Sequence, residues 1–173
     1  ALKLCAPGIP DIYQGTEYLD LSLVDPDNRR PVDYPRRAQT LANSDAGDPD
    51  NRKQGLIAQL LAVRRAHPDL FRRGSYEPLA PEGADSDHLI AFARLSGDQA
   101  LVVAAPRLVA HLLKADGTYR ESAFQGATLP LPAGYAWTHL QDGTPAGDDS
   151  AGLDVGAALQ AYTLILLQGD RTG

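Results

Sequence analysis

The feature that most constrains this chain is a change in the spacing of its apolar residues near positions 68 to 75. Before that point, apolar side chains recur at the three- and four-residue spacing of a helix. From Phe71 onward they alternate with polar side chains, as in strands that bury one face. We therefore place a boundary at residue 70 and expect an α+β chain with two differently built parts.

The part after the boundary is predicted to be an antiparallel β-sandwich. Its expected strands are residues 76–79, 88–95, 100–105, 108–113, 127–131 and 162–167. They are separated by Gly/Asp pairs such as Gly97-Asp98 and Asp116-Gly117, which are typical of tight turns. We interpret Trp137, the only tryptophan, as a core anchor rather than as a platform for stacking sugar.

The part before the boundary opens with a short apolar segment, Leu2 to Ala6, which Pro7-Gly8 ends. Such a segment suits a strand that is buried on both faces. A polar loop follows, and loops beside buried strands commonly carry binding groups. Two helices are then expected, one from Pro35 to Asn43 and one that Asp48 caps and that ends near His67.

Composition argues against several classes of function. The net charge is −6 and no basic stripe is present, so we expect no nucleic-acid partner. No apolar run approaches the roughly 20 residues that cross a bilayer, so we expect no membrane partner. The single Cys5 makes no internal disulfide, and no histidine has neighbours at metal-ligand spacing. We therefore expect no metal, no cofactor and a reducing, cytoplasmic location.

The start of the chain predicts that it is cut from a longer protein. It contains no methionine, and its expected first strand has no preceding element with which to pair. The edge of residues 2–13 is then expected to seek a partner. That partner is either the missing segment of the same protein or another copy of the chain.

Two motifs resemble a known family. The run from Pro7 to Glu17, PGIPDIYQGTE, resembles the motif on the eighth barrel strand of the α-amylase superfamily. The run from Asp20 to Tyr34, DLSLVDPDNRRPVDY, is similar to the maltooligosyl trehalose synthase family within it. Leu70 to Tyr76, LFRRGSY, also resembles that family, where its barrel passes into its C-terminal domain. Beyond Tyr76 the resemblance is one of pattern.

The resemblance implies both a fold and an activity. Residues 1–70 are expected to be the last β/α unit of a (β/α)8 barrel, and residues 71–173 a C-terminal β-sandwich. The implied reaction is an intramolecular transglucosylation, in which the reducing-end α-1,4 linkage of a maltooligosaccharide becomes an α,α-1,1 linkage. Such chemistry needs two opposed carboxyl groups. In the superfamily these lie on earlier strands, so we assign no catalytic residue and expect the chain alone to be inactive.

The resemblance also implies where the sugar binds, because barrel active sites lie at the C-terminal ends of the strands. The candidate substrate-binding residues are Tyr13, Gln14 and Glu17 at the rim, with Asp27, Asn28, Arg29, Arg30 and Asp33 in the loop above. Guanidinium, amide and carboxylate groups suit sugar hydroxyls. The opposing interpretation is structural, with an Asp25–Arg29 ion pair and with Glu17 accepting from loop amides.

Two other functions stay open. The chain belongs either to an amylase or debranching enzyme that shares the eighth-strand motif and hydrolyses its substrate, or to a non-catalytic glucan-binding sandwich. The latter predicts a flat row of exposed aromatic side chains. Aromatic residues make up only 6% of the chain and no strand alternates them outward, so we rank it last.

Overall fold

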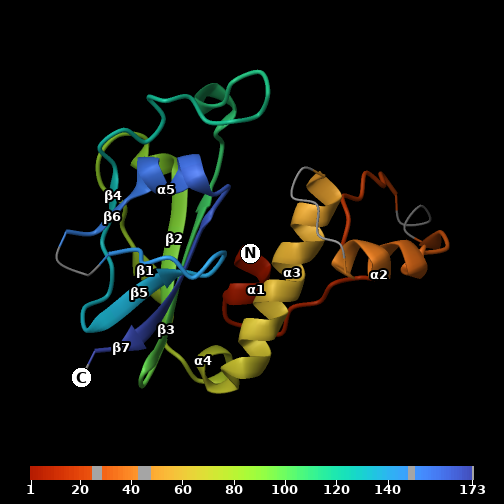
Figure 1. Ribbon diagram of the computed structural model, residues 1–173, viewed down its shortest axis with the longest axis horizontal. Helices are drawn as coiled ribbons and strands as arrows, with labels where there is room; N and C mark the ends of the chain where they lie inside the picture. Colours follow the sequence, from red (N-terminus) through yellow and green to blue (C-terminus); the bar gives the residue numbers. More distant parts are fainter. Residues whose placement is uncertain (25–28, 43–47, 148–150, 173) are drawn as a thin grey trace.

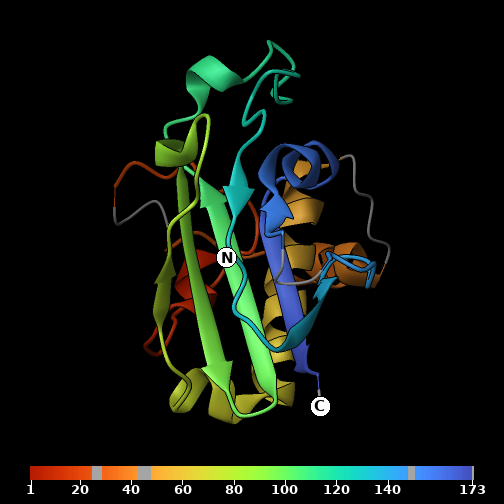
Figure 2. The same cartoon turned by 90° about the vertical axis from the view of Figure 1, so that its left-hand side faces the viewer.

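A five-stranded antiparallel sheet lies at the centre of the structure (Figure 1). The structure is a computed structural model that describes residues 1–24, 29–42, 48–147 and 151–172. The strands, in spatial order, are β1 (Glu77–Leu79), β2 (Leu89–Ser96), β3 (Gln99–Pro106), β7 (Ile165–Arg171) and β5 (Tyr135–His139). Figure 2 shows β2, β3 and β7 running side by side.

Most of the remaining elements cover the two faces of this sheet, whereas the helix from Tyr34 to Ala42 packs on the helix that follows it. The helices are α1 (Leu2–Cys5), α2 (Tyr34–Ala42), α3 (Pro49–Ala66), α4 (Pro68–Arg72) and α5 (Val155–Ala161). A second, two-stranded ladder joins β4 (Thr128–Leu129) to β6 (Leu153–Asp154). In Figure 1, α1 and α3 lie on one side of the sheet and α5 lies on the other.

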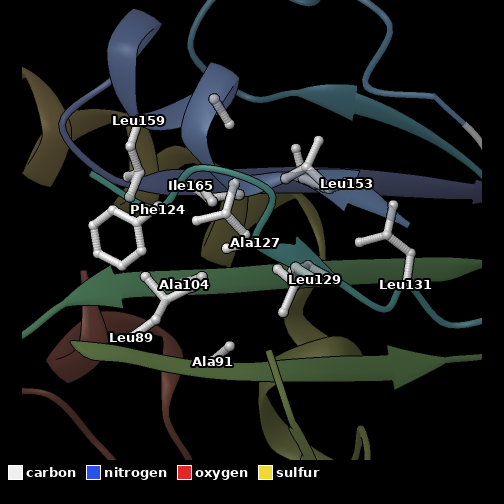
Figure 3. Packing of buried hydrophobic residues seen from close by; sticks show 14 of the residues in the cluster. Leu89, Ala91, Ala104, Phe124, Ala127, Leu129, Leu131, Leu153, Leu159 and Ile165 are labelled. Carbon is white, nitrogen blue, oxygen red and sulfur yellow. The ribbon is translucent and has the colours of Figure 1, made fainter. Parts of the chain in front are cut away.

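Alternation along the central strands produces two hydrophobic cores, one on each face. Phe92, Leu101 and Leu166 pack with Leu60 and Phe71 on the face that α1, α3 and α4 cover. The intervening residues face β4, β6 and α5. Figure 3 shows Ala91, Ala104 and Ile165 of the central strands beside Leu129 of β4 and Leu159 of α5. The sheet therefore joins the first third of the chain to the last.

Much of the sequence-based prediction is confirmed. The expected helices correspond to α2 and α3, and the Asp48 carboxylate caps α3 by accepting from the Asp50 amide at 3.0 Å. Helix α3 ends at Ala66, directly before His67 and Pro68. The strands expected at 76–79, 88–95 and 100–105 correspond to β1, β2 and β3. Trp137 is 2% exposed within the second core, which confirms its interpretation as an anchor.

The prediction of a strand at Leu2 to Ala6 is wrong, because these residues form α1. A run this short fits either a strand or a helical turn by periodicity. A turn satisfies its backbone internally, since the Cys5 amide donates to the Ala1 carbonyl at 3.1 Å and the Ala6 amide to the Leu2 carbonyl at 2.9 Å. Leu4 and Cys5 are still buried, against the helical face of the sheet.

The sandwich is present only in part. Instead of a full second sheet, the two-residue strands β4 and β6 pack with α5 against the central sheet. The strand expected at 108–113 is wrong, because Leu108 has φ +53°, outside the extended region, and Ala110–Leu112 form a 3-10 helix. The strand expected at 162–167 begins later, at Ile165.

Candidate functional site

The polar loop between α1 and α2 is held in place by the first turns of α3. The Lys53 ammonium donates to the Tyr18 carbonyl at 2.5 Å, and the Asp50 carboxylate accepts from the Leu19 amide at 2.8 Å. The Gln54 side chain, 7% exposed, donates to the Arg37 carbonyl at 3.1 Å. These three residues have the spacing of one helix face, so a single face of α3 orients both the loop and α2.

Tyr18 is the buried centre of this loop, at 6% exposure. Its ring lies beneath the guanidinium groups of Arg37, at 4.4 Å from the ring centroid, and Arg36, at 5.2 Å. Its hydroxyl shares a hydrogen bond with the Thr40 hydroxyl at 2.6 Å. The Arg37 Nε donates to Glu17 at 3.1 Å, so this predicted site residue forms an ion pair with α2.

Beside this centre lies an open pocket of about 300 Å³, which we call the loop pocket. Its lining residues are Gln14, Gly15, Tyr18, Asp20, Ser22, Arg30, Pro31, Val32, Asp33, Arg36 and Arg37. Three of the predicted site residues, Gln14, Arg30 and Asp33, therefore converge on one surface. The pocket combines carboxylates, guanidinium groups and an amide, which suits a ligand rich in hydroxyl groups.

The carboxylates of the loop pocket are fixed by local hydrogen bonds. Asp20 accepts from the Ser22 hydroxyl at 2.5 Å and from its amide at 3.0 Å, and these bonds, the hydroxyl first, hold the pKa of Asp20 below its ordinary value. Asp33 accepts from the Arg36 amide at 2.9 Å and so caps α2. A carboxyl group that protonates a leaving oxygen needs a raised pKa. Asp20 therefore suits binding rather than acid catalysis.

The other predicted site residues lie elsewhere. Tyr13, which is 46% exposed, lines a separate pocket of about 410 Å³ between the start of the chain and α3. Arg29 is exposed and does not line the loop pocket. Asp27 and Asn28 lie outside the described residues, as does the Asp25 of the alternative Asp25–Arg29 ion pair.

The sequence-based prediction assigned no site role to five lining residues, although Tyr18 and Asp20 belong to the polar loop that it identified: Tyr18, Asp20, Ser22, Arg36 and Arg37. The pair Asp20 and Ser22 does carry a readable signal, because an Asp two positions before Ser or Thr commonly closes a local turn. Nothing in the sequence pairs Tyr18 with two arginines of α2, since that contact depends on tertiary packing.

Within the described residues, no cluster of three or more His, Cys, Asp or Glu side chains is placed to bind a metal ion. None of the described helices combines the length and apolar character that a membrane span requires.

The chain matches curated proteins of one kind. Two proteins named maltooligosyl trehalose synthase, from two strains of Mycobacterium tuberculosis, are each 38% identical to it over 164 residues. The match covers 95% of the chain and 19% of each relative, so the chain spans about a fifth of their length. No protein-family model matches the chain.

Solved structures agree with the sequence match. The maltooligosyltrehalose synthase of Arthrobacter ramosus is 32% identical, with a TM-score of 0.76 over 97% of this chain and 21% of its own. An Anoxybacillus α-amylase shares the fold alone, with 19% identity and a TM-score of 0.55 over 99% of this chain and 31% of its own. In sequence and in fold, this chain is thus similar to a segment of the maltooligosyl trehalose synthases that it matches, a segment about a fifth of their length.

Proposed function

We propose that this chain is part of a maltooligosyl trehalose synthase, to which it contributes sugar-binding surface through the loop pocket. The observation that carries the proposal is the 38% identity over 95% of the chain. The proposed reaction moves the reducing-end glucose of a maltooligosaccharide from an α-1,4 to an α,α-1,1 linkage within one substrate molecule.

The catalytic carboxyl groups are proposed to lie in the longer enzyme, outside this chain. We propose that residues 1–70 complete its catalytic barrel and that residues 71–173 form its C-terminal domain. The loop pocket then positions the glucose between cleavage and re-addition. Arg30 would donate hydrogen bonds to its hydroxyls, Asp33 would accept from them, and the Gln14 amide could do either. Exclusion of water would favour re-addition over hydrolysis.

An exposed apolar segment supports the existence of a larger partner. Along residues 19–24, Asp20 and Ser22 line the loop pocket and the other four residues are apolar. Leu21 is 90% exposed and Leu23 is 93% exposed. Several large apolar side chains that are exposed close together beside a pocket are typical of an interface. We propose that the rest of the same enzyme covers them, with a second copy of the chain as the alternative.

The reaction is tested by incubating the complete enzyme with maltopentaose. Transglucosylation converts the substrate into a non-reducing isomer, so the concentration of reducing ends falls while the total sugar mass stays in one product. An amylase or debranching activity, our second candidate, would instead create new reducing ends. That result would refute the proposed reaction.

The role of the loop pocket is tested by Arg30→Ala and Asp33→Asn in the complete enzyme. Asparagine keeps the cap of α2 while removing the carboxylate charge, so this variant separates binding from folding. We expect both variants to lower the ratio of isomerised to hydrolysed product, measured by chromatography. Arg65→Ala, an exposed change on α3, is the matched control and should leave the ratio unchanged.

The glucan-binding module stays the third candidate. A pull-down on insoluble glucan with the segment from Phe71 onward tests it, and retention of that segment would favour it. The cytoplasmic location stays a prediction, which rests on a single free and buried cysteine, Cys5.

A further inference from the structure

Arg94 is a charged side chain buried in the centre of the structure. It belongs to β2, is 1% exposed, and shares the helical face of the sheet with Phe92. Its guanidinium donates five hydrogen bonds, all to main-chain carbonyl oxygens. The acceptors are Ser75 at 2.7 Å, Cys5 at 3.0 Å, Leu70 at 3.0 Å, Gly74 at 3.1 Å and Phe71 at 3.2 Å.

These carbonyls belong to two helix ends that are distant in sequence. Cys5 is the last residue of α1, whereas Leu70 and Phe71 lie in α4 and Gly74 follows it. The last carbonyls of a helix have no partner within it and carry partial negative charge. The single planar guanidinium group therefore donates to the free carbonyls at the ends of both α1 and α4. The partial negative charge of these carbonyls stabilises its positive charge.

A second arginine strengthens the same junction. Arg64 of α3 donates to the Leu4 carbonyl at 2.6 Å, and its guanidinium lies 4.5 Å from the ring centroid of Phe71. Burial, and then the nearby charge of Arg64, lower the pKa of Arg94. Helix α1 is thus fixed to the sheet by one arginine and to α3 by another.

Both supports of the loop pocket connect to this junction, one directly and the other along the length of α3. Residues 6–17 follow Cys5 directly and include Gln14, which lines the loop pocket. Helix α3, which continues into α4, holds the other side of the loop through Asp50 and Lys53. Movement of α1 relative to α4 would shift one wall of the pocket against the other.

We propose that Arg94 is a positioning residue for the loop pocket. Through it, the β-sheet fixes α1, which leads into one pocket wall, and α4, which follows the helix that holds the loop. This inference rests on the proposed function, in which a firmly held pocket retains glucose and excludes water. It gives the β-rich part of the chain a role in the outcome of the reaction without any contact between that part and the sugar.

Arg94→Lys in the complete enzyme tests the inference. Lysine keeps the positive charge but has one ammonium on a flexible stem, so it cannot span both helix ends. Small displacements of positioning groups have large effects on rate, so we expect the ratio of isomerised to hydrolysed product to fall at least about threefold. The ratio is independent of the amount of folded enzyme, so instability alone would not change it.

Two further variants complete the test. Arg64→Lys weakens the contacts of Arg64 with the Leu4 carbonyl and the Phe71 ring but leaves Arg94 in place. It should lower the ratio less and in the same direction, and an unchanged ratio in this variant would overturn the inference if Arg94→Lys does not fold. Arg120→Lys is the control, because Arg120 donates to the Leu113 carbonyl at 3.2 Å, far in sequence from both helix ends. An unchanged ratio in folded Arg94→Lys enzyme would overturn the inference.

Failure of the proposed function would give a different result from failure of the positioning role. If the unmodified enzyme forms no non-reducing product, that proposal fails, and hydrogen exchange then tests the positioning role directly. The Leu19 amide, bonded to Asp50 at 2.8 Å, should exchange faster in Arg94→Lys than in Arg120→Lys. Equal exchange rates in the two variants would refute the role of Arg94.

Discussion

The same local hydrogen-bond pattern recurs in several turns of this chain: an aspartate accepts two hydrogen bonds from the Ser or Thr two positions later. Asp20 with Ser22, Asp116 with Thr118 and Asp142 with Thr144 share this geometry. In each case the hydrogen bonds hold the pKa of the carboxyl group below its ordinary value. Each exposed turn is thereby fixed by its own carboxylate. The turn of Asp20 and Ser22 also forms part of the lining of the loop pocket.

The effect of these hydrogen bonds on a pKa can be measured at Asp142. Hydrogen bonds from the Tyr162 hydroxyl at 2.6 Å, and then from Thr144, lower the pKa of Asp142 from 3.8 to about 2. Because the folded-state pKa is the lower one, the interaction stabilises the fold above about pH 4 and is lost as the pH falls toward 2. Tyr162→Phe should raise the pKa of Asp142 toward 3.8, as measured by NMR titration of the carboxyl carbon.

Asp116 is the internal control for that titration, since its partner is Thr118 and not Tyr162. Its pKa should be the same in both proteins. An unchanged pKa of Asp142 in Tyr162→Phe would show that the tyrosine hydroxyl does not stabilise the carboxylate.

At the scale of elements, helix α3 organises the first third of the chain. One face packs Leu60 and Val63 against the sheet, and its first turns hold the loop. Its start is defined by the Asp48 cap followed by Pro49 at the first helical position. Because the loop depends on this start, changes in the stability of α3 reach the loop pocket.

Two substitutions in α3 are expected to have opposite effects. Asp48→Ala removes the cap and should lower the free energy of unfolding by about 1 kcal/mol. Gly55→Ala should raise it by about 0.5–1 kcal/mol, since the added methyl group meets nothing within 4 Å and alanine favours the helix. Urea denaturation of the two variants checks this, and a stabilising Asp48→Ala would contradict the role of the cap.

Elements with strong local signals could be predicted from the sequence, and the others depend on their surroundings. Helix α3, with its Asp48 cap and the proline that follows its end, and the long hairpin of β2 and β3 were of the first kind. Helix α5 begins at the Asp154 cap, but it directly follows a Gly/Asp-rich stretch and was missed. In the site, the polar loop was recognised, whereas the burial of Tyr18 between α2 and the loop needs tertiary contacts that no local pattern encodes.

At the scale of the whole molecule, the sheet has a core on each face, while the exposed leucines Leu21 and Leu23 belong to neither core. Leu21 and Leu23 contribute little to the fold of this chain, because both are almost fully exposed. In the longer enzyme we propose that they are buried. Their energetic role should therefore depend on the rest of the protein.

The double substitution Leu21→Ser and Leu23→Ser tests that dependence. We expect the melting temperature of the isolated chain to stay the same and that of the complete enzyme to fall, because burial of each leucine stabilises by about 1.5–3 kcal/mol. Calorimetry of both proteins checks this. An unaffected complete enzyme would mean that the segment stays in solvent there.

A structure of the complete enzyme with a bound maltooligosaccharide would show whether the loop pocket binds sugar in a trehalose-forming enzyme. We expect sugar hydroxyls at hydrogen-bonding distance, about 3 Å, from at least one of Gln14, Arg30 and Asp33. A sugar bound in the active site with the loop pocket covered by another part of the protein would contradict this expectation.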